Sequence, residues 1–492
     1  MELMNLVFFL SFLGIVNAAK PLTFQVPIHR RMDPSLLHQI FHVDSYEKVP
    51  DYEVVRMRVA SKQAIDGGEE KTIHFSVFGQ EINLSLRRND FLNERIKSLK
   101  MYTTEKTNKD KHYKEIPTKD YNSAVTYKDL NHMAAITIRQ GKNGVIQMEG
   151  IIGSDLVIKP VPIDVMITEE NEVENFENIS NSYFDLLPAN TSNKTIQTVE
   201  TAPHFIIKNQ KISRDFKNDY LSLPGKQGIF NRHEGTSNQS KKVFRSKRDI
   251  SAVYPEVLII IDYSTFVDYD RNHDAIKNRY VNMWNMVSNL FEPLSNPEVK
   301  FSIAGFFFIE TEEDDEFISR NRIPNHDALE QFAVAGDVGR YLYEEQNNLP
   351  KHDIAVIVTR LDLCALKNYK PCDSISVGIG YIGGACFVDH DNKAMRNFAI
   401  VEDYDGFVGA LIIAHEIGHL FGAEHDGEYV YMLPNDFKLR SCTTKSGYIM
   451  SSMASIEHSQ WSTCSIEQFE YFFSSETSSC LLNNPAEDKE QV

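Results

Sequence analysis

Three histidines at close spacing form the strongest chemical pattern in the sequence, which reads H-E-x-x-H-x-x-G-x-x-H-D from residue 415. His415 and His419 are four residues apart, so on a helix they lie on one face and can share one zinc ion. Gly422 can end that helix in a left-handed conformation, and the turn after it lets His425 approach the same metal. Three protein ligands leave a fourth position open to water, which is typical of a catalytic zinc site.

Glu416 directly follows the first histidine and can take a proton from that water. The same residue types could stand on an ordinary surface helix, but the added glycine and third histidine weaken that alternative. The pattern therefore predicts a hydrolytic zinc centre in which Glu416 acts as general base and then as general acid.

The chain before the zinc helix alternates between strand and helix patterns. Glu256 to Asp262 encloses a continuous apolar run, typical of a strand that is buried on both faces. Further strands are expected at 299–310, 353–359, 378–384 and 397–403, with helices near 272–290 and 327–346 and the zinc helix from 405 or 406. This alternation predicts an α/β fold with a mixed, mostly parallel twisted sheet and right-handed crossovers. Periodicity is weak after His425, so a small, loop-rich lower subdomain is expected there.

The first half of the chain has a different character. Alternating segments at 53–59, 72–86 and 133–168 predict a β-rich region. From about residue 169 to 245 the sequence is polar, which predicts an exposed linker. The linker ends in Arg245-Ser246-Lys247-Arg248, typical of furin-type processing by a proprotein convertase after Arg248; a solvated basic run is the alternative. Net charge also changes at this boundary, from +4 in residues 1–248 to −22 in residues 249–492.

The N-terminus and the composition indicate where the protein works. The apolar run from Leu6 to Val16, followed by small residues, predicts a secretory signal of residues 1–18 that is too short to cross a bilayer. No later segment is long and apolar enough to span a membrane, so we expect a secreted, extracellular product. The formal net charge of −18 argues against nucleic acid as a partner. Six cysteines, all in the second half, predict three disulfides. N-glycosylation triplets, which also arise by chance, occur at Asn83, Asn178, Asn190, Asn193 and Asn238.

The zinc pattern resembles the metzincin signature of zinc proteases. Asp426, directly after the third histidine, resembles the reprolysin (adamalysin) branch and would anchor the loop that follows that ligand. Metzincins also place a methionine turn beneath the zinc. Residues 447–451 fit this turn with Met450, and Met453 is the competing candidate.

A closer resemblance begins at Asp353. Residues 353–364 and 383–386 are similar to the catalytic domain of the disintegrin-and-metalloproteinase proteins with thrombospondin motifs. That resemblance implies the disulfides Cys364–Cys372, Cys386–Cys480 and Cys442–Cys464, without a fourth bridge whose positions are Ala333 and Phe398 here. It also implies a structural calcium ion, held by Glu256, Asp353, the Cys480 carbonyl and Asn483. The family usually has Asp in place of Asn483, so one ligand charge is lost; plain strand-end carboxylates are the alternative.

The β-rich first half resembles a reprolysin propeptide. The expected organisation is therefore a signal peptide (1–18), a propeptide (19–248) and a zinc protease domain (249–492). Many metzincins keep the zymogen inactive through a propeptide thiolate on zinc, but residues 1–248 contain no cysteine. Latency would have to come from another ligand or from steric cover, aided by the attraction between unlike charges.

These features predict a monomeric, secreted zinc endopeptidase that cleaves extracellular proteins, with the strand at 378–384 pairing with an extended substrate. The short chain, with twelve residues after Cys480, is similar to venom or salivary proteases of arthropods. The alternatives are a non-catalytic toxin or decoy on a metalloprotease fold, and a zinc enzyme that is not a protease.

Overall fold

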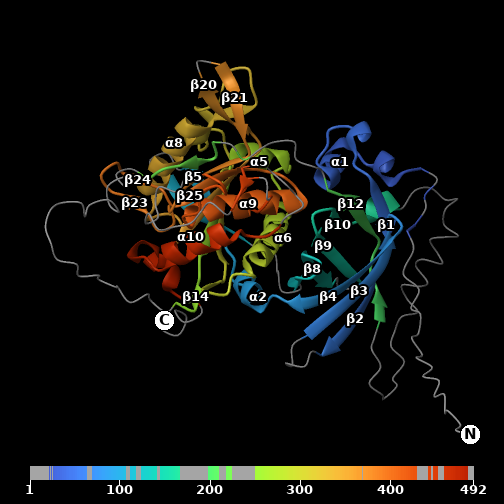
Figure 1. The fold of residues 1–492 in the computed structure, drawn as a ribbon. Coiled ribbons are helices and arrows are strands. Elements are labelled where there is room, and N and C mark those ends of the chain that lie inside the picture. Colours follow the sequence, from blue (N-terminus) through green and yellow to red (C-terminus); the bar gives the residue numbers. More distant parts are fainter. Residues whose placement is uncertain are drawn as a thin grey trace, which may run out of the picture.

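The computed structural model describes most of the chain. The described residues are 21–22, 24, 26–63, 69–106, 111–117, 124–140, 145–166, 198–209, 216, 218–223, 250–367, 370–428, 442–444, 447–452 and 459–485. Below, the N-terminal region means the described residues up to 223, and the C-terminal region means those from 250 onward. The two regions lie side by side, with the N-terminal sheet on the right and the C-terminal region on the left of Figure 1. In the part of the chain that the structure describes, no helix is long and apolar enough to cross a membrane.

The N-terminal region is built on a ten-stranded antiparallel sheet that curves like half of a barrel (Figure 1). In spatial order its strands are β1 (Tyr52–Val55), β12 (His204–Lys208), β10 (Leu156–Pro160), β9 (Ile146–Ile152), β8 (Ala134–Gln140), β7 (Ala124–Asp129), β4 (Gln80–Arg88), β3 (Glu69–Val77), β2 (Arg58–Gln63) and β11 (Thr198–Glu200). The helical segments of this region are η1 (Ile28–Arg31), α1 (Pro34–Phe41), η2 (Tyr46–Lys48), α2 (Asp90–Ile96) and α3 (Ile163–Met166).

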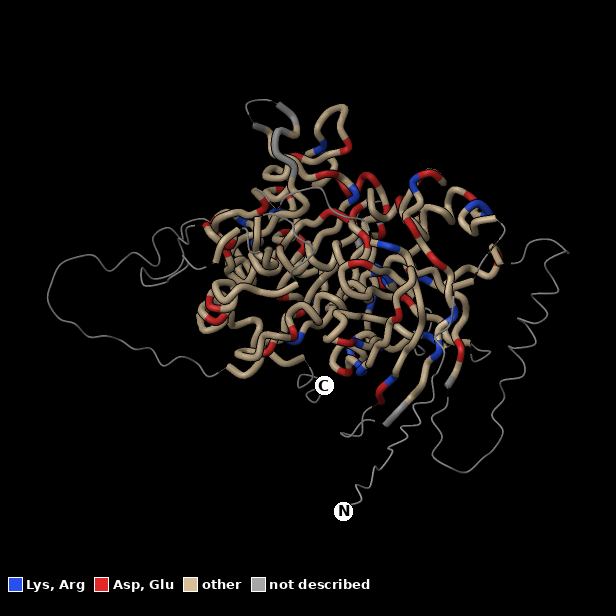
Figure 2. Tube along the Cα trace, turned by 45° about the vertical axis from the view of Figure 1, so that its right-hand side comes forward, with Lys and Arg blue, Asp and Glu red and all other residues tan. Residues whose placement is uncertain are grey.

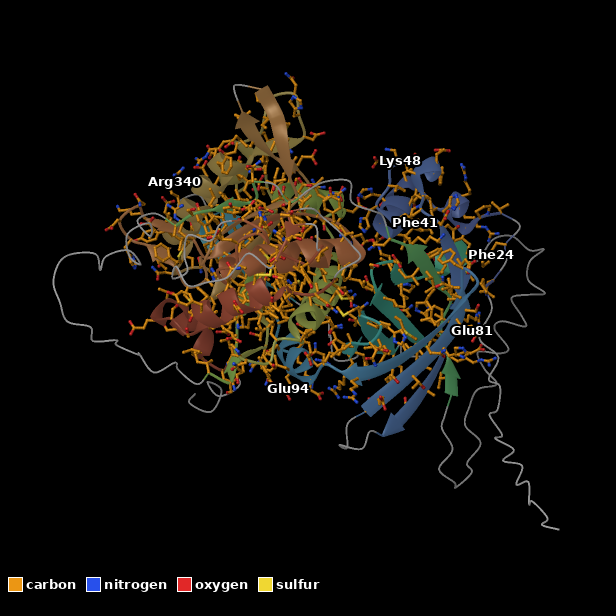
Figure 3. The ribbon with its side chains drawn as sticks, viewed as in Figure 1. Phe24, Phe41, Lys48, Glu81, Glu94 and Arg340 are labelled. Atoms are coloured by element: carbon orange, nitrogen blue, oxygen red, sulfur yellow. A yellow bond between two sulfur atoms is a disulfide. The ribbon has the colours of Figure 1, made fainter. Side chains whose placement is uncertain are left out.

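Alternation along the strands explains the core of this sheet. In β3 and β4 every second residue is buried, including Ile73, Phe75, Leu84 and Leu86. A strand places successive side chains on opposite faces, so this pattern gives one apolar and one solvated face. Asn83 lies on the exposed side of β4. A second apolar cluster packs under α1, which carries Phe41 (Figure 3). The ring centroids of Phe41 and Phe205 lie 5.3 Å apart.

The prediction of an exposed linker from about residue 169 to 245 is wrong for two described stretches. Residues 198–209 contain β11 and β12, and β12 lies inside the ten-stranded sheet with four of its five residues buried. Residues 218–223 include strand β13 (Tyr220–Leu221). The general polarity of the stretch concealed the short apolar run His204–Ile207, which is enough for one strand.

The C-terminal region is built on a mixed, mostly parallel sheet, as expected. Its central strands, in spatial order, are β22 (Gly378–Tyr381), β25 (Phe398–Glu402), β19 (Ile354–Thr359), β15 (Glu256–Ile261) and β17 (Ser302–Phe308). All neighbouring pairs among them are parallel except β22 with β25. Every residue of β19 is buried, which agrees with a strand covered on both faces.

Helices and short sheets surround this central sheet. The helices are α5 (Tyr263–Asp268), α6 (His273–Phe291), α7 (Glu316–Ser319), α8 (Gln331–Glu345), α9 (Gly406–Leu420), α10 (Thr463–Phe473) and η6 (Glu476–Leu482). The small sheets comprise β14 (Ala252–Val253), β16 (Glu298–Val299), β18 (Ala328–Glu330), β20 (Asp362–Lys367), β21 (Lys370–Ser376), β23 (Val388–Asp389) and β24 (Ala394–Met395). Helix α10 was not expected in the loop-rich part; Ser462 caps it, and Phe469, Phe472 and Phe473 bury one of its faces.

Strands of the N-terminal region extend this sheet at both edges. β5 (Met101–Lys106) pairs in parallel with β17, and β6 (Lys111–Ile116) pairs with β5. At the other edge β13 pairs in parallel with β22. Among the described residues this sheet therefore has eight strands, in the order β13-β22-β25-β19-β15-β17-β5-β6. Three of the eight come from the first half of the sequence, so the two regions are joined by backbone hydrogen bonds.

Helix α6 lies between the two sheets and presents a polar stripe to the N-terminal one. Asn282, Asn285 and Asn289, spaced three and four residues apart, lie on one helix face and are buried. The side-chain amide of Asn285 donates to the Tyr127 carbonyl, and that of Asn289 donates to the Ala134 carbonyl, each at 2.9 Å. Buried amides that use backbone carbonyls of the other region make a polar contact, typical of surfaces that can also exist apart.

A group of charged residues joins the regions beside α1. We name it the interface ion cluster; it comprises His42 and Lys159 from the N-terminal region with Arg279, Asp403 and Asp405 from the C-terminal region. The Lys159 ammonium lies 2.9 Å from the Asp405 carboxylate, which also caps the N-terminus of α9. Figure 2 shows acidic residues spread along the trace of the C-terminal region, consistent with its negative net charge.

Candidate metal centre

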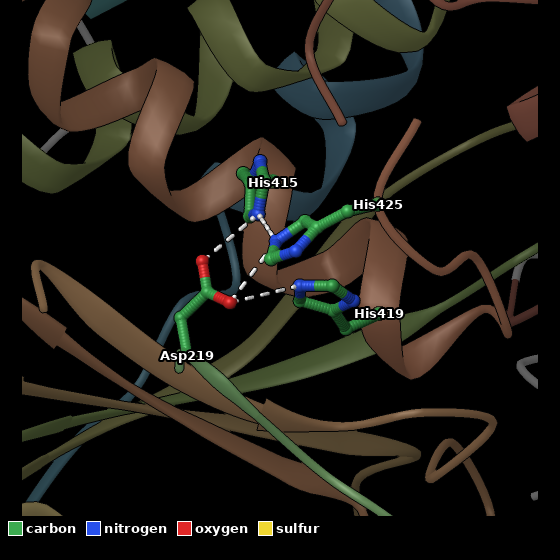
Figure 4. A group of neighbouring side chains, drawn as sticks. All are labelled: Asp219, His415, His419 and His425. Carbon is green, nitrogen blue, oxygen red and sulfur yellow. Dashed lines mark hydrogen bonds and ion pairs between the residues drawn. The ribbon is translucent and has the colours of Figure 1, made fainter. Parts of the chain in front are cut away.

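Helix α9 carries two of the three histidines and directs them to the same side. His415 and His419 lie one turn apart near its C-terminal end, and both are fully buried. Leu420 is the last helical residue, and Gly422 follows with φ +91°, a conformation that residues with a Cβ rarely adopt. This turn brings His425 back beneath the helix, as the sequence predicted (Figure 4).

The Nε2 atoms of the three histidines converge, and a fourth group meets them. The fourth group is Asp219, a fully buried residue of the N-terminal region that directly precedes β13. Its carboxylate oxygens lie 3.2 Å from Nε2 of His415, 3.6 Å from that of His419 and 3.0 Å from that of His425 (Figure 4). The Nε2 atoms of His415 and His425 are 3.3 Å apart.

These distances fit a tetrahedral zinc ion. With zinc–ligand bonds of about 2.0–2.1 Å, ligands on a tetrahedron lie about 3.3–3.4 Å from one another. Within the described residues, the two carboxylate oxygens of Asp219 have no hydrogen-bond partner, and Nε2 of His419 has none either. A buried carboxylate without a donor is costly, and a cation between these atoms would remove that cost. Three imidazoles and one carboxylate are, in addition, ligand types that zinc prefers.

Each imidazole has an acceptor oxygen near its other ring nitrogen, Nδ1. Nδ1 of His415 lies 2.6 Å from the Ile449 carbonyl, and Nδ1 of His419 lies 2.8 Å from the Ala423 carbonyl. Nδ1 of His425 lies 3.4 Å from the Glu428 carboxylate. Acceptors at Nδ1 favour the tautomer whose Nε2 lone pair points to the metal.

The methionine turn lies directly beneath α9. Met450 is fully buried, and a Cβ on Gly418 would lie only 2.5 Å from its sulfur, so the side chain packs against the helix between the two histidines. The backbone N–H of Asp426 donates to the Met450 carbonyl at 2.9 Å, and its carboxylate accepts from the Ser462 hydroxyl at 2.6 Å. Asp426 thus ties the loop after His425 to this turn. Met453, the other candidate, lies outside the described residues.

Glu416 projects from α9 toward strand β22. Its side chain is fully buried, and a Cβ on Gly378 would lie 2.4 Å from its Oε1 atom. A Cβ on Gly380 would lie 3.2 Å from Oε2. The two glycines therefore leave room for this carboxylate beside β22.

Electrostatics at the centre reflect burial and the carboxylate of Asp219. Burial alone would raise the pKa of Asp219, but His425 and the other two histidines hold it well below its usual range. Burial lowers the pKa of His419 to about 4. Burial also lowers that of His425, but the Asp219 charge outweighs it and raises the pKa to about 9. Burial and the Asp219 charge raise the pKa of Glu416.

Sequence reasoning missed Asp219, because it lies in the stretch that was expected to be linker. The available signal was the absence of cysteine from residues 1–248, which left another ligand as one route to latency. Apolar residues surround Asp219 in the sequence, with Phe216, Leu221 and Leu223 close by. These could have indicated a buried segment, although many acidic residues in that half have similar neighbours.

The residues expected to bind calcium lie close together. The backbone N–H of Glu256 donates to the Asp353 carboxylate at 2.9 Å, and the Asn483 amide donates to the Glu256 carboxylate at 3.2 Å. Cys480 is bonded to Cys386, whose N–H donates to the Asp353 carbonyl at 3.4 Å. Burial raises the pKa of Asp353 to about 7, and the neighbouring Glu256 charge contributes in the same direction. Calcium binding by these residues stays a prediction.

The three disulfides in the structure are Cys364–Cys372, Cys386–Cys480 and Cys442–Cys464, the pairs that the resemblance implied. Asp426 lies near the last pair, but both sulfurs are engaged with each other and cannot bind a metal. Arg248 and the triplets at Asn178, Asn190, Asn193 and Asn238 lie outside the described residues.

Comparison with known proteins identifies the family. Residues 255–464 match the family model described as metallo-peptidase family M12, of reprolysin type. A Bombyx mori protein named "A disintegrin and metalloproteinase with thrombospondin motifs like" is 30% identical over 498 residues, which cover 92% of this chain and 71% of that protein. The chain belongs to metallopeptidase family M12. The family resemblance seen in the sequence is thereby confirmed, and the chain is a metalloendopeptidase with an intact histidine triad.

Two further relatives show how the similarity is distributed. "Venom metalloproteinase 3" of Eulophus pennicornis is 21% identical and is matched over 84% of this chain and 86% of its own length. Human "A disintegrin and metalloproteinase with thrombospondin motifs 16" is 28% identical over 55% of this chain, but only 20% of that longer protein is covered.

Proposed function

We propose that this M12 protease is a secreted zinc endopeptidase that is made as a zymogen and cleaves extracellular proteins. The observation that carries the proposal is the meeting of three buried histidines, Glu416 and the strand β22 at one place. His415, His419 and His425 would hold the zinc ion. When bound, zinc polarises the scissile carbonyl and lowers the pKa of a water molecule.

The residues of this chain supply the rest of the chemistry. Glu416 accepts the proton of the attacking water and then donates it to the leaving amine. Gly378 and Gly380 let its carboxylate lie close to the backbone of β22. In the C-terminal region taken alone, β22 is an edge strand, because its other neighbour, β13, comes from the N-terminal region. An extended substrate can pair with such an edge through main-chain hydrogen bonds.

We assign residues 1–18 to the signal peptide, 19–248 to the propeptide and 249–492 to the mature protease, with processing after Arg248. The polar contacts of α6 and the interface ion cluster support a separable N-terminal region. Three disulfides and the relatives of the disintegrin-and-metalloproteinase and venom types support secretion. A role as a venom or salivary protein of an arthropod follows only by analogy with the venom relative.

The decisive experiment measures cleavage of a quenched peptide library by the processed protein, with and without a zinc chelator. We expect turnover that the chelator abolishes and that added zinc restores. Glu416→Ala should retain one zinc per chain but lose about 10²–10⁴-fold in kcat. A processed protein that binds zinc and cleaves nothing would instead support the decoy alternative. Turnover in Glu416→Ala close to that of the parent would remove the assignment of the base.

A further inference from the structure

The segment around Asp219 lies along the candidate active site. Residues 218–221 run beside β22, where the Gly380 N–H donates to the Asp219 carbonyl at 2.9 Å and the Ile382 N–H donates to the Leu221 carbonyl at 3.0 Å. The Gln331 side chain donates to the Asn218 carbonyl at 2.5 Å. The segment therefore uses the hydrogen bonds that an extended substrate would need.

Aromatic side chains on both sides of Asp219 hold this segment against the histidines. The ring of Phe216 stacks on that of His415 with 4.1 Å between centroids and 9° between planes. The Tyr220 ring lies 5.3 Å from His419, and its hydroxyl donates to the Glu428 carboxylate at 2.8 Å. Contacts on either side fix where the Asp219 side chain can point, so its approach to the three Nε2 atoms is directed by its neighbours.

A cation at this point would balance the charges of the site. Asp219 and Glu416 are both fully buried, and neither carboxylate has a hydrogen-bond donor among the described residues. Two carboxylates buried close together repel each other unless a positive charge lies near them. In this site that charge would lie between Asp219 and the histidines. A zinc ion bound by the histidines supplies that charge and accepts the carboxylate as its fourth ligand.

We propose that Asp219 is the inhibitory zinc ligand of the uncleaved chain, and that Phe216 and residues 218–223 keep the protease latent by filling the water position and the substrate edge together. This inference rests on the zinc protease function proposed above. The carboxylate takes the place that a cysteine thiolate cannot take, because the first 248 residues have no cysteine. Cleavage after Arg248 would cut the tether and lower the effective concentration of the ligand, so Asp219 could then dissociate with its region.

The test uses the full chain held uncut by Arg248→Ala, with cobalt(II) in place of zinc. Its absorption spectrum reports the fourth ligand directly and does not depend on turnover. We compare this parent with Asp219→Asn and Asp219→Ala in the same background. Asp51→Asn is the matched control, since Asp51 is an exposed carboxylate of the N-terminal region that pairs with Lys208. Binding of acetohydroxamate, followed by the same spectrum, reports access to the metal.

We expect the parent and the Asp51 control to share one spectrum, and both Asp219 variants to show a changed spectrum in which water replaces the carboxylate. Acetohydroxamate should bind the variants at least about tenfold more tightly, because no tethered ligand competes with it. Identical spectra and equal hydroxamate affinity in all four proteins would overturn the inference. Asp219→Asn is close in size to the parent and keeps the test decisive if Asp219→Ala does not fold.

Metal content separates this inference from the function on which it rests. One metal ion per chain together with unchanged spectra removes Asp219 as a ligand and leaves the zinc protease intact. Absence of bound metal from the parent and the variants alike, with an inactive processed form, would contradict the proposed function itself. Peptide cleavage by the uncut Asp219 variants should stay below that of processed enzyme, because Phe216 still stacks on His415 and β13 still covers β22.

Discussion

Replacement of Gly378 by alanine should move the Glu416 carboxylate, to which we assign the role of general base, without unfolding the protein. The added Cβ would lie 2.4 Å from Oε1 of Glu416 and 2.7 Å from its Cγ and Cδ atoms, where ordinary contacts begin at 3.4 Å. The carboxylate must therefore shift by roughly 1 Å, a displacement that can cost about 10²-fold in rate, or about 2.7 kcal/mol of barrier. Gly378 does not have a positive φ, so alanine is compatible with the backbone there.

Stability should change little, because the atoms that yield are the end of one flexible side chain. We expect the free energy of unfolding of Gly378→Ala to stay within about 1 kcal/mol of the parent. The matched control is Gly336→Ala in helix α8, where the nearest atom to a Cβ is an Arg340 nitrogen at 3.9 Å. In that helix alanine should stabilise by up to about 1 kcal/mol and leave turnover unchanged.

The assay compares kcat and KM for a quenched peptide with zinc content and Tm in the processed enzymes. The expected result for Gly378→Ala is full zinc, near-parent Tm and a fall of about 10²-fold that appears mainly in kcat. Full zinc with kcat within twofold of the parent would refute the placement of the Glu416 carboxylate against β22. An equal loss in both glycine variants would show that the effect is not specific to this contact.

Three further outcomes are expected. N-terminal sequencing of the secreted mature chain should begin at Asp249, and a start more than a few residues away would remove the furin-type processing site. Organomercurials should not activate the zymogen, since residues 1–248 have no thiol to release; prompt activation would contradict a carboxylate ligand. Size exclusion of protein that has been cleaved after Arg248 should show weaker association of the N-terminal region with the C-terminal region at pH 5 than at pH 7. Unchanged or tighter association at pH 5 would refute this prediction. Burial lowers the pKa of His42 well below 6.5 in the associated state, so association requires the neutral ring and is lost as pH falls below 6.5. The hydrogen bond to Asp268 raises the pKa of His38, so protonation of His38 strengthens association instead. That strengthening is complete once the pH has fallen below 6.5, and it does not offset the loss from His42 at lower pH.

Much of the C-terminal region could be predicted because its signals are local. The apolar run at 256–262 became β15, and the helix expected at 272–290 became α6 (His273–Phe291). The zinc helix began where expected, at Gly406 after its Asp405 cap. Each of these follows from residues adjacent in sequence, whose periodicity and capping chemistry act within a few turns.

Predictions failed where a long-range contact decides the structure. A polar composition indicated linker for residues 198–223, yet β12 is inserted between β1 and β10. No strand was expected at residues 101–106, and only the pairing of β5 with Phe306–Phe308 of β17 shows that this segment belongs to the other region's sheet. Partners in these pairings lie between 44 residues apart, for Pro160 with His204, and 205 residues apart, for Met101 with Phe306, so periodicity within one segment cannot reveal them.

The sequence by itself determined the chemistry of this protein: which side chains can hold zinc, which carboxylate can move a proton, and that no thiol in the first half can block the metal. Spacing on one helix is enough for His415 and His419, because helix geometry places residues four apart on one face. Tertiary structure alone decided what meets these ligands from the opposite side. Asp219 is almost two hundred residues away in the chain and reaches the histidines only because β13 pairs with β22 and Phe216 stacks on His415. Such an encounter depends on the packing of two regions against each other, which no local pattern encodes.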